Sequence, residues 1–314
     1  MIVVGVDVSK DTLVAVAIDK STRIKNSFTI ENNKENVDKW LIDLPYKKLL
    51  LACEATAEYH RVLALLALSR KIPLRLLNPI VTKQYTKATV RKRKTDPQDA
   101  LTIAKLAQQG EGRLISSQTF HIAKTHERTA IKLSHMRQRL LLMQQHIQEV
   151  DPDDTSSLEQ LQNCIDVIEK STKAFRKKAE SKVDAREIEL LCSIPGVGET
   201  IATVLLAEIG DINEFKSAKA VVAYAGLDPK VKQSGGRLHH NTHLTKRGSP
   251  YLRQMLYTGA SIAQRHDKEL KAYYEKKRAE GKRYKEATVA VARKLLSRVY
   301  AVLKRQSPYV KEKE

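Results

Sequence analysis

The sequence predicts an α/β domain at its N-terminus, followed by a chain that is mainly α-helical. Three β-branched, apolar runs at residues 2–9, 12–18 and 24–30 are typical of consecutive strands in a meander. A helical pattern at 32–44, a strand at 48–53, a helix at 58–68 and a strand at 73–77 then alternate, which favours parallel strands. From residue 96 onward, the apolar residues recur mostly at helical spacing.

The charge balance indicates a polyanionic partner. The chain has 314 residues, 42% of them hydrophobic, which is enough for two or three domains with proper cores. Its 56 Lys and Arg outnumber 36 Asp and Glu, for a net charge of +20. Residues 59–95 hold 10 basic and no acidic residues, and residues 230–314 hold 22 against 7. No apolar run approaches the roughly 20 residues of a membrane span, so nucleic acid is favoured over a membrane surface.

The N-terminus and the cysteines exclude other classes of protein. Residues 1–5 lack the basic lead and the cleavage pattern of a signal peptide, so we expect a cytoplasmic protein. Cys53, Cys164 and Cys192 are isolated and form no CxxC pair. This pattern argues against a disulfide framework and against a thiolate zinc site.

Two carboxylates stand at conspicuous places in the predicted sheet. Asp7 interrupts an apolar central strand, where a buried charge is costly unless it is paired or bound to a metal. Glu54 follows the apolar strand 48–53, and ligands in α/β sheets collect at the carboxyl ends of strands.

A second pair of carboxylates opens the predicted helix 96–108. Asp96 and Asp99 lie at i and i+3, on one face, with Pro97 in the first turn. Such a pair can hold a divalent metal, but an N-cap and a first-turn acid that counters the helix dipole explain the same pattern. Four cations that can bind phosphate precede the pair: Arg91, Lys92, Arg93 and Lys94.

Three segments together resemble a known family. Residues 5–10 (GVDVSK), 53–56 (CEAT) and 94–100 (KTDPQDA) resemble the RuvC-like, ribonuclease-H-fold domain of DEDD-type insertion-sequence transposases, which are RNA-guided recombinases. Ala57 stands where many relatives are expected to have glycine. The resemblance implies an acidic tetrad that holds Mg²⁺, formed by Asp7, Glu54, Asp96 and Asp99.

The middle of the chain predicts a helical hairpin. Six apolar residues of segment 118–150 alternate at spacings of three and four, as in a coiled-coil seam: Leu133, Met136, Leu140, Met143, Ile147 and Val150. Residues 151–156 break the helix, and a second helix begins at 157. The pair is either an intramolecular packing arm or a contact between protomers. The family resemblance implies the contact, in a dimer that assembles to a tetramer.

Residues 194–200 (IPGVGET) lie between two apolar helical segments and resemble a helix-hairpin-helix motif. The proline ends the first helix, while Gly196 and Gly198 permit a tight turn. Backbone N–H groups at the start of the second helix can then bind phosphate without reading sequence. A plain helical turn is the alternative.

The C-terminal segment carries the second chemical candidate. Residues 223–229 (AYAGLDP), 233–236 (QSGG), 245–248 (TKRG) and 252–253 (LR) resemble the C-terminal domain of the same family, in which the serine of the Ser-Gly pair is the nucleophile. This implies that Ser234 is the nucleophile, although the residue by itself is typical of a turn. The predicted nucleic-acid contacts here are Lys246, Arg247 and Arg253.

Two further clusters of polar residues remain open. A zinc site and a phosphate-binding or solvated loop both fit His239, His240 and His243. Helices are predicted at 251–263 and 285–302, and the cations around them favour nucleic-acid contact over a solvated face: Arg265, Lys276, Lys277, Arg278, Lys282, Arg283 and Lys285.

The sequence thus predicts three parts: a metal-binding RuvC-like domain at 1–112, a coiled-coil oligomerisation segment at 113–185, and a mainly helical transposase domain at 186–314. The predicted function is Mg²⁺-dependent DNA cleavage and rejoining through a covalent phosphoserine. Donor and target DNA and a structured guide RNA are the partners that the resemblance implies. The alternatives are a metal-dependent, structure-specific nuclease without a covalent intermediate, and a non-catalytic nucleic-acid-binding protein.

Overall fold

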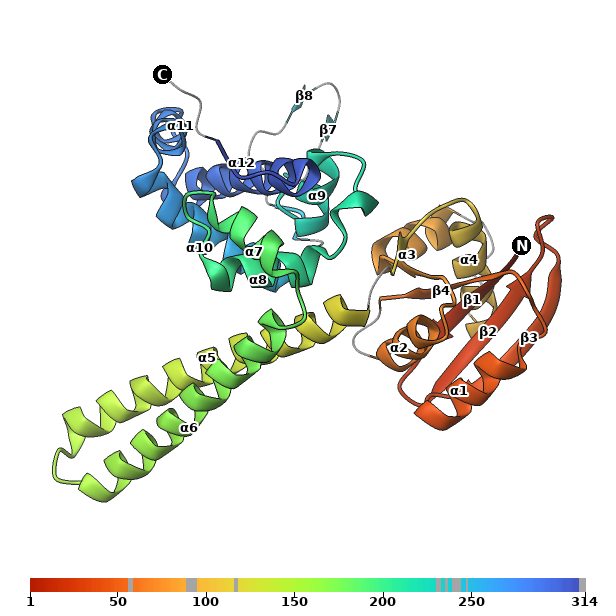
Figure 1. Cartoon of the computed structure of the whole chain (residues 1–314), viewed down its shortest axis with the longest axis horizontal. Coiled ribbons are helices and arrows are strands. Elements are labelled where there is room, and N and C mark those ends of the chain that lie inside the picture. The colour runs from red at the N-terminus through yellow and green to blue at the C-terminus, as the bar shows by residue number, and fades with distance from the viewer. Residues whose placement is uncertain are drawn as a thin grey trace. The chain divides into compact units, whose positions relative to one another are not determined.

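The computed structural model describes residues 1–55, 59–88, 95–115, 118–229, 233–234, 237–238, 244–246 and 248–310. The chain divides into two compact units, Met1–Gln118 and Thr119–Glu314 (Figure 1). Each unit is described by itself below.

The first unit is built on a mixed six-stranded sheet, which confirms the predicted α/β class. The strand order is β3-β2-β1-β4-β5-β6. β2 is antiparallel to β1 and β3, β4 is parallel to β1 and β5, and β6 is antiparallel to β5. The strands are β1 (Ile2–Val8), β2 (Thr12–Ile18), β3 (Ile24–Glu31), β4 (Leu49–Glu54), β5 (Leu74–Leu77) and β6 (Arg113–Leu114). Five of them lie where the apolar runs predict them, whereas β6 has only two residues and no recognisable pattern.

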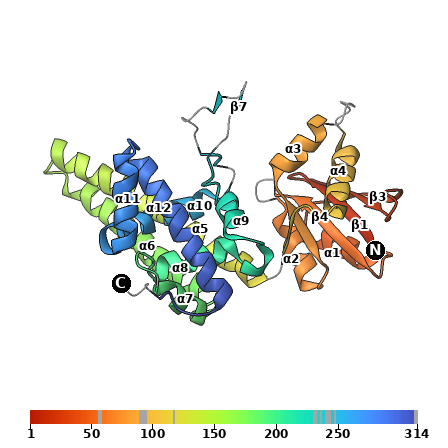
Figure 2. The ribbon, with the colours of Figure 1, turned by 90° about the horizontal axis from the view of Figure 1, so that it is seen from above.

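Helices cover both faces of this sheet (Figure 2). They are α1 (Lys34–Asp43), α2 (Arg61–Ser69), α3 (Pro79–Ala88) and α4 (Asp96–Gln108). α1 and α2 pack on the face that includes Val4 and Val6, and α4 packs on the face that includes Val3. The sequence did not predict α3. This helix begins at Pro79, and the side chain of the preceding Asn78 accepts a hydrogen bond from the Ile80 N–H at 3.0 Å.

Alternation along β1 decides which residues face α4. Val3 faces α4 and Val4 faces α1 and α2, so Gly5 and Asp7 belong to the α4 face. At Gly5 a Cβ atom would lie 2.1 Å from the carbonyl oxygen of Ala100 and 2.4 Å from the backbone nitrogen of Ala104. Glycine is therefore what lets α4 approach the central strand this closely.

The second unit begins with a long helical hairpin, α5 (Gln118–Val150) and α6 (Thr155–Glu180). Its second helix starts two residues earlier than predicted, at a cap in which Asp154 accepts a hydrogen bond from the Ser157 N–H at 3.1 Å. Met136, Met143 and Val150 of the predicted seam are more than half exposed. These three positions therefore do not pack within the hairpin.

The remaining helices of the second unit surround one apolar core. They are α7 (Ala185–Cys192), α8 (Glu199–Ile209), the 3-10 turn η1 (Ile212–Glu214), α9 (Ala218–Ala225), α10 (Pro250–His266), α11 (Lys268–Ala279) and α12 (Tyr284–Arg305). The short antiparallel strands β7 (Gln233–Ser234) and β8 (Arg237–Leu238) lie between α9 and α10. The sequence predicts α10 and α12, whereas α9 and α11 were not predicted. In the part of the chain that the structure describes, no helix is long and apolar enough to cross a membrane.

Candidate functional site

Asp7 and Glu54 lie side by side at the carboxyl ends of two adjacent parallel strands. β1 and β4 pair with Val6 opposite Cys53, so each carboxylate is the next residue along its strand. The Thr82 hydroxyl of α3 donates a hydrogen bond to Oε2 of Glu54 at 2.7 Å. This bond orients the Glu54 carboxylate from the side of α3.

Asp96 and Asp99 occupy the first turn of α4, as predicted. The helix is N-capped by Thr95, whose carbonyl accepts hydrogen bonds from the Gln98 and Asp99 N–H groups at 2.9 and 3.0 Å. Asp96 is therefore the first helical residue and not the cap. Favourable interaction with the helix dipole remains compatible with both aspartates.

The pKa of Asp7 depends on the other three carboxylates. Burial, followed by the charges of Asp99, Asp96 and Glu54, raises the pKa of Asp7 to about 6, against a smaller lowering by the backbone N–H of Val8. All three carboxylates therefore act on Asp7 at short range. In hardness and charge this donor set fits a divalent cation. Among the described residues, however, no three His, Cys, Asp or Glu side chains are grouped closely enough to hold a metal ion.

Several predicted residues lie outside the described part of the chain. They are Ala57, the cations Arg91, Lys92, Arg93, Lys94 and Arg247, and the histidines His239, His240 and His243. Their roles stay predictions.

Ser234 belongs to the second unit, whereas the four carboxylates belong to the first. Its backbone lies in β7 and pairs with Arg237 of β8. The four predicted metal ligands therefore belong to one unit, and the backbone of the predicted nucleophile lies in a short strand of the other.

The base of the segment that carries Ser234 is closed by polar contacts. The Thr245 hydroxyl donates to Oδ1 of Asp228 at 2.6 Å, and the Thr245 N–H donates to the Asp228 carbonyl at 2.9 Å. Pro229 and Leu244 add an isolated antiparallel bridge. Both ends of the segment are therefore held together.

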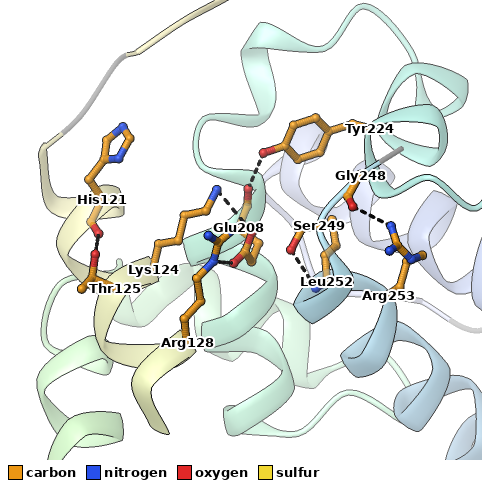
Figure 3. A network of polar contacts seen from close by, with 10 residues as sticks. All are labelled: His121, Lys124, Thr125, Arg128, Glu208, Tyr224, Gly248, Ser249, Leu252 and Arg253. Carbon is orange, nitrogen blue, oxygen red and sulfur yellow. Dashed lines mark hydrogen bonds and ion pairs between the residues drawn. The ribbon is translucent and has the colours of Figure 1, made fainter. Parts of the chain in front are cut away.

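Arg253 holds the same region from α10 (Figure 3). Its Nη1 donates to the carbonyl oxygens of Ala225 at 3.1 Å and of Gly248 at 2.6 Å. A Cβ atom on Gly248 would lie 1.8 Å from the carbonyl oxygen of Tyr224, so only glycine permits this approach. The guanidinium predicted to contact nucleic acid thus already has a structural role, and nucleic-acid binding by Arg253 stays a prediction. Lys246 is exposed, with a positive φ of 50°.

The sequence did not predict a buried ion cluster beside this region (Figure 3). Glu208, at 2% exposure, accepts from Nε of Arg128 at 2.6 Å and lies 3.2 Å from Nζ of Lys124. Burial alone raises the pKa of Glu208, but the two cations and their bonds hold it below its ordinary value. The Tyr224 hydroxyl donates to the Glu208 carbonyl at 3.0 Å. The one sequence signal was an acid inside the apolar run 201–209.

The two glycines of the predicted phosphate-binding turn have different surroundings. At Gly196, with φ +89°, a Cβ atom would lie 2.5 Å from the carbonyl oxygen of Gly259 and 2.7 Å from Cβ of Ala263. This glycine therefore lets the turn pack directly on α10. Gly198 is the N-cap of α8, and a Cβ there would meet no atom within 4 Å. Of the two positions, only Gly198 has free space beside it, and phosphate binding stays a prediction for both.

Comparisons with known proteins give a consistent result over the whole chain. Residues 4–161 match the DEDD_Tnp_IS110 family model, described as "Transposase", and residues 188–275 match the model "Transposase IS116/IS110/IS902 family". The pilin gene-inverting protein of Moraxella bovis is 29% identical, over 98% of this chain and 97% of its own length. The transposase for insertion sequence element IS1111A of Coxiella burnetii is 24% identical, over 98% of this chain and 91% of its own.

Among solved structures, Thermus thermophilus RuvC in complex with a Holliday junction substrate matches 37% of this chain and 99% of its own length, with 15% identity and a TM-score of 0.28. The family of this chain is assigned from the two family models alone, because the first of them spans half of the sequence. This protein belongs to the IS116/IS110/IS902 family of transposases.

Proposed function

We propose that this transposase cleaves and rejoins DNA through a covalent link between Ser234 and a strand phosphate, with Mg²⁺ held by four carboxylates: Asp7, Glu54, Asp96 and Asp99. The observation that supports the proposal is electrostatic: the charges of Asp99, Asp96 and Glu54 add to burial in raising the pKa of Asp7 to about 6. Four acids in one place repel each other, and a hard cation relieves that repulsion. When bound, the ion would polarise the scissile phosphate as a Lewis acid.

Ser234 supplies the nucleophile in this scheme. Its Oγ forms a bond to phosphorus while the bond to the departing strand oxygen breaks, and the proton lost by the serine balances the one gained by that oxygen. A hydroxyl of the second strand then attacks the phosphoserine, which frees Ser234 and joins the new ends. The phosphodiester energy is kept in the covalent link, so rejoining needs no external energy source.

The clamp at the base of the serine segment supports this role. Asp228 and Thr245 hold the two ends together, and Arg253 ties them to α10. A nucleophile must be presented in a defined geometry, and these contacts fix the positions of the two residues from which the serine segment departs. The same clamp serves whether Ser234 meets the tetrad of its own protomer or that of a partner protomer.

A covalent adduct is the direct test of the serine role. The purified protein is mixed with donor and target DNA, Mg²⁺ and RNA from its own element, then denatured and examined for labelled DNA that migrates with protein. Wild type and the matched control Ser181→Ala should form the adduct, and Ser234→Ala should not. Persistence of the adduct in Ser234→Ala would refute the serine role. Cleavage by Ser234→Ala without an adduct would favour the metal-dependent nuclease.

The tetrad is tested by neutral, nearly isosteric substitutions. We expect Asp7→Asn and Asp99→Asn to abolish strand cleavage while nucleic-acid binding is kept, because each removes one anionic ligand for the ion. Asp43→Asn, an exposed carboxylate at the end of α1, is the matched control and should cleave normally. Unchanged cleavage in both tetrad variants would favour a non-catalytic binding protein.

A structured non-coding RNA is the guide in this proposal, so base pairing with donor and target DNA selects the sequence. Two separate basic stretches, at residues 59–95 and 230–314, suit a combined load of RNA and DNA. Co-purification tests this point: RNA of one defined length should accompany the protein expressed with its flanking DNA. Recombination that continues after complete ribonuclease treatment would exclude the guide.

The helical hairpin supports the proposed dimer that assembles to a tetramer. Met136, Met143 and Val150 leave apolar surface exposed along α5, and a second protomer would cover it. Light scattering on the double variant Met136→Glu and Met143→Glu should give a smaller assembly than wild type. The exposed control Gln145→Glu should leave the mass unchanged. An unchanged mass in the double variant would remove the hairpin from the interface.

A further inference from the structure

Three tyrosines from three helices meet at the junction of α10, α11 and α12. The rings of Tyr274 and Tyr284 meet edge to face, with centroids 6.1 Å apart and planes at 73°. Burial, and next to it the proximity of Tyr284, raises the pKa of Tyr257, which places this third ring beside them. Tyr284 is 50% exposed at the first position of α12. One ring of the cluster therefore presents much of its surface to solvent while the other two support it.

Cations surround this cluster. Residues 271–285 contain seven Lys and Arg against two Glu. Some of these charges are used within the protein: Lys277 lies 2.8 Å from Oε2 of Glu280. Lys276, Lys282 and Lys285 are exposed, and within the described residues none of them forms an ion pair. Lys276 and Lys282 also lower the pKa of the nearby Glu280, but all three lysines leave their charge exposed around the α11–α12 turn.

This combination of groups distinguishes a stacking surface from ordinary solvated helix ends. A basic surface alone binds any nucleic acid through its phosphates. An exposed aromatic ring adds a partner for the face of a base, and only unpaired bases have free faces. The geometry points to a surface at the α11–α12 turn that binds single-stranded nucleic acid, and we propose that Tyr284 stacks on a base while Lys276, Lys282 and Lys285 contact the flanking phosphates.

Arg293 of α12 lies beyond this surface along the helix. Burial lowers its pKa, and the proximity of Tyr273 and Asp228 opposes this. Its Nε is buried without a hydrogen-bond partner among the described residues. Lys294, the next residue, lies 4.5 Å from the centroid of the Tyr273 ring. Lys294 also forms an ion pair with Glu269 at 2.8 Å, so Arg293 and Lys294 are engaged within the protein and the proposed surface is confined to the α11–α12 turn.

Binding is tested apart from catalysis, in the full-length Ser234→Ala protein with EDTA present. Fluorescence anisotropy is measured with 20-nucleotide oligo-U RNA, oligo-dT DNA and a mixed-sequence DNA duplex. Since stacking contributes about 1–3 kcal/mol per base, Tyr284→Ala should bind the single strands about 5- to 150-fold more weakly, with duplex affinity within about twofold of the parent. Tyr284→Phe keeps the ring and should bind like the parent. The single strand that loses more affinity identifies RNA or DNA as the preferred ligand.

A charge variant tests the phosphate contacts. Lys282→Gln with Lys285→Gln should reduce the salt dependence of single-strand binding by about 0.7 per lost phosphate contact. Lys216 and Lys219 are also exposed, and the control variant Lys216→Gln with Lys219→Gln should leave the salt dependence of binding unchanged. Thermal unfolding of every variant checks that the fold is kept. Equal single-strand affinity of Tyr284→Ala and its parent would overturn the proposal, as would an equal loss for duplex. These measurements need no strand cleavage, so they test the binding surface even if the proposed recombinase mechanism is wrong.

Discussion

Glu127 of α5 makes the stability of the second unit depend on pH. Its side chain is 1% exposed, and Oε2 has no hydrogen-bond partner among the described residues. Burial raises its pKa from 4.5 to about 7; Arg176 lowers the pKa and Glu180 raises it further. The folded protein therefore holds this proton at a pH where the unfolded chain has lost it.

The sign and size of the effect follow from linkage. Because the pKa is higher in the folded state, stability falls as the pH rises from about 4.5 to about 7 and then levels off. A pKa of 4.5 in the unfolded chain and about 7 in the folded protein lowers the free energy of unfolding, relative to the protonated state at low pH, by about 3 kcal/mol at pH 8.5 and about 1 kcal/mol at pH 5. Glu127→Gln removes the ionisation, so it should gain about 2 kcal/mol on wild type between these two pH values.

Urea unfolding at pH 5, 6, 7 and 8.5, followed by helix circular dichroism, measures the difference between variant and wild type. Glu159→Gln, an exposed acid on α6, is the matched control and should show a difference that does not change with pH. A constant difference in unfolding free energy between Glu127→Gln and wild type across the series would refute the reasoning, and so would a variant that loses stability relative to wild type as the pH rises.

Three further predictions concern single contacts. Glu208→Gln leaves two partly buried cations with a neutral partner and should lower the free energy of unfolding by about 1–3 kcal/mol, measured by urea denaturation; a loss under about 0.5 kcal/mol would contradict it. Gly5→Ala places a Cβ against the backbone of α4 and should cost about 1–3 kcal/mol, with strand cleavage reduced, whereas the control Gly198→Ala stays within about 1 kcal/mol of wild type. Arg253→Gln should open residues 226–248 to limited proteolysis at least several-fold faster; an unchanged digestion pattern would refute the clamp.

Local patterns predicted much of the first unit because its elements are encoded locally. The β-branched runs of β1 and β2 and the apolar run of β4 specify strands without help from distant residues. The start of α4 is marked by a proline and two acids in its first turn. α3 and α11 escaped prediction because Lys, Thr and Glu leave them few apolar positions, and contacts with neighbouring elements stabilise them instead.

The site was predictable only where its residues carry a local signal. Asp7 is conspicuous in an apolar strand, and the charges of Asp99, Asp96 and Glu54 raise its pKa, whereas the metal site itself stays a prediction. Glu208 was not predicted, because its partner Arg128 is 80 residues away in sequence. Gly196 follows a phosphate-binding pattern, yet it packs on Gly259, more than 60 residues along the chain. Such pairings depend on the folded arrangement and leave no trace in either segment alone.

The absence of a side chain at Gly5 determines how far apart β1 and α4 lie. With no side chain on Gly5, the separation of β1 and α4 at this point is set by close packing against the backbone of Ala100 and Ala104, and protein interiors yield little to compression. The first turn of α4 and the end of β1 are thereby held at a fixed distance from each other by the polypeptide alone. A residue larger than glycine at this position would widen the gap and separate Asp96 and Asp99 from Asp7, although none of the three would have been altered.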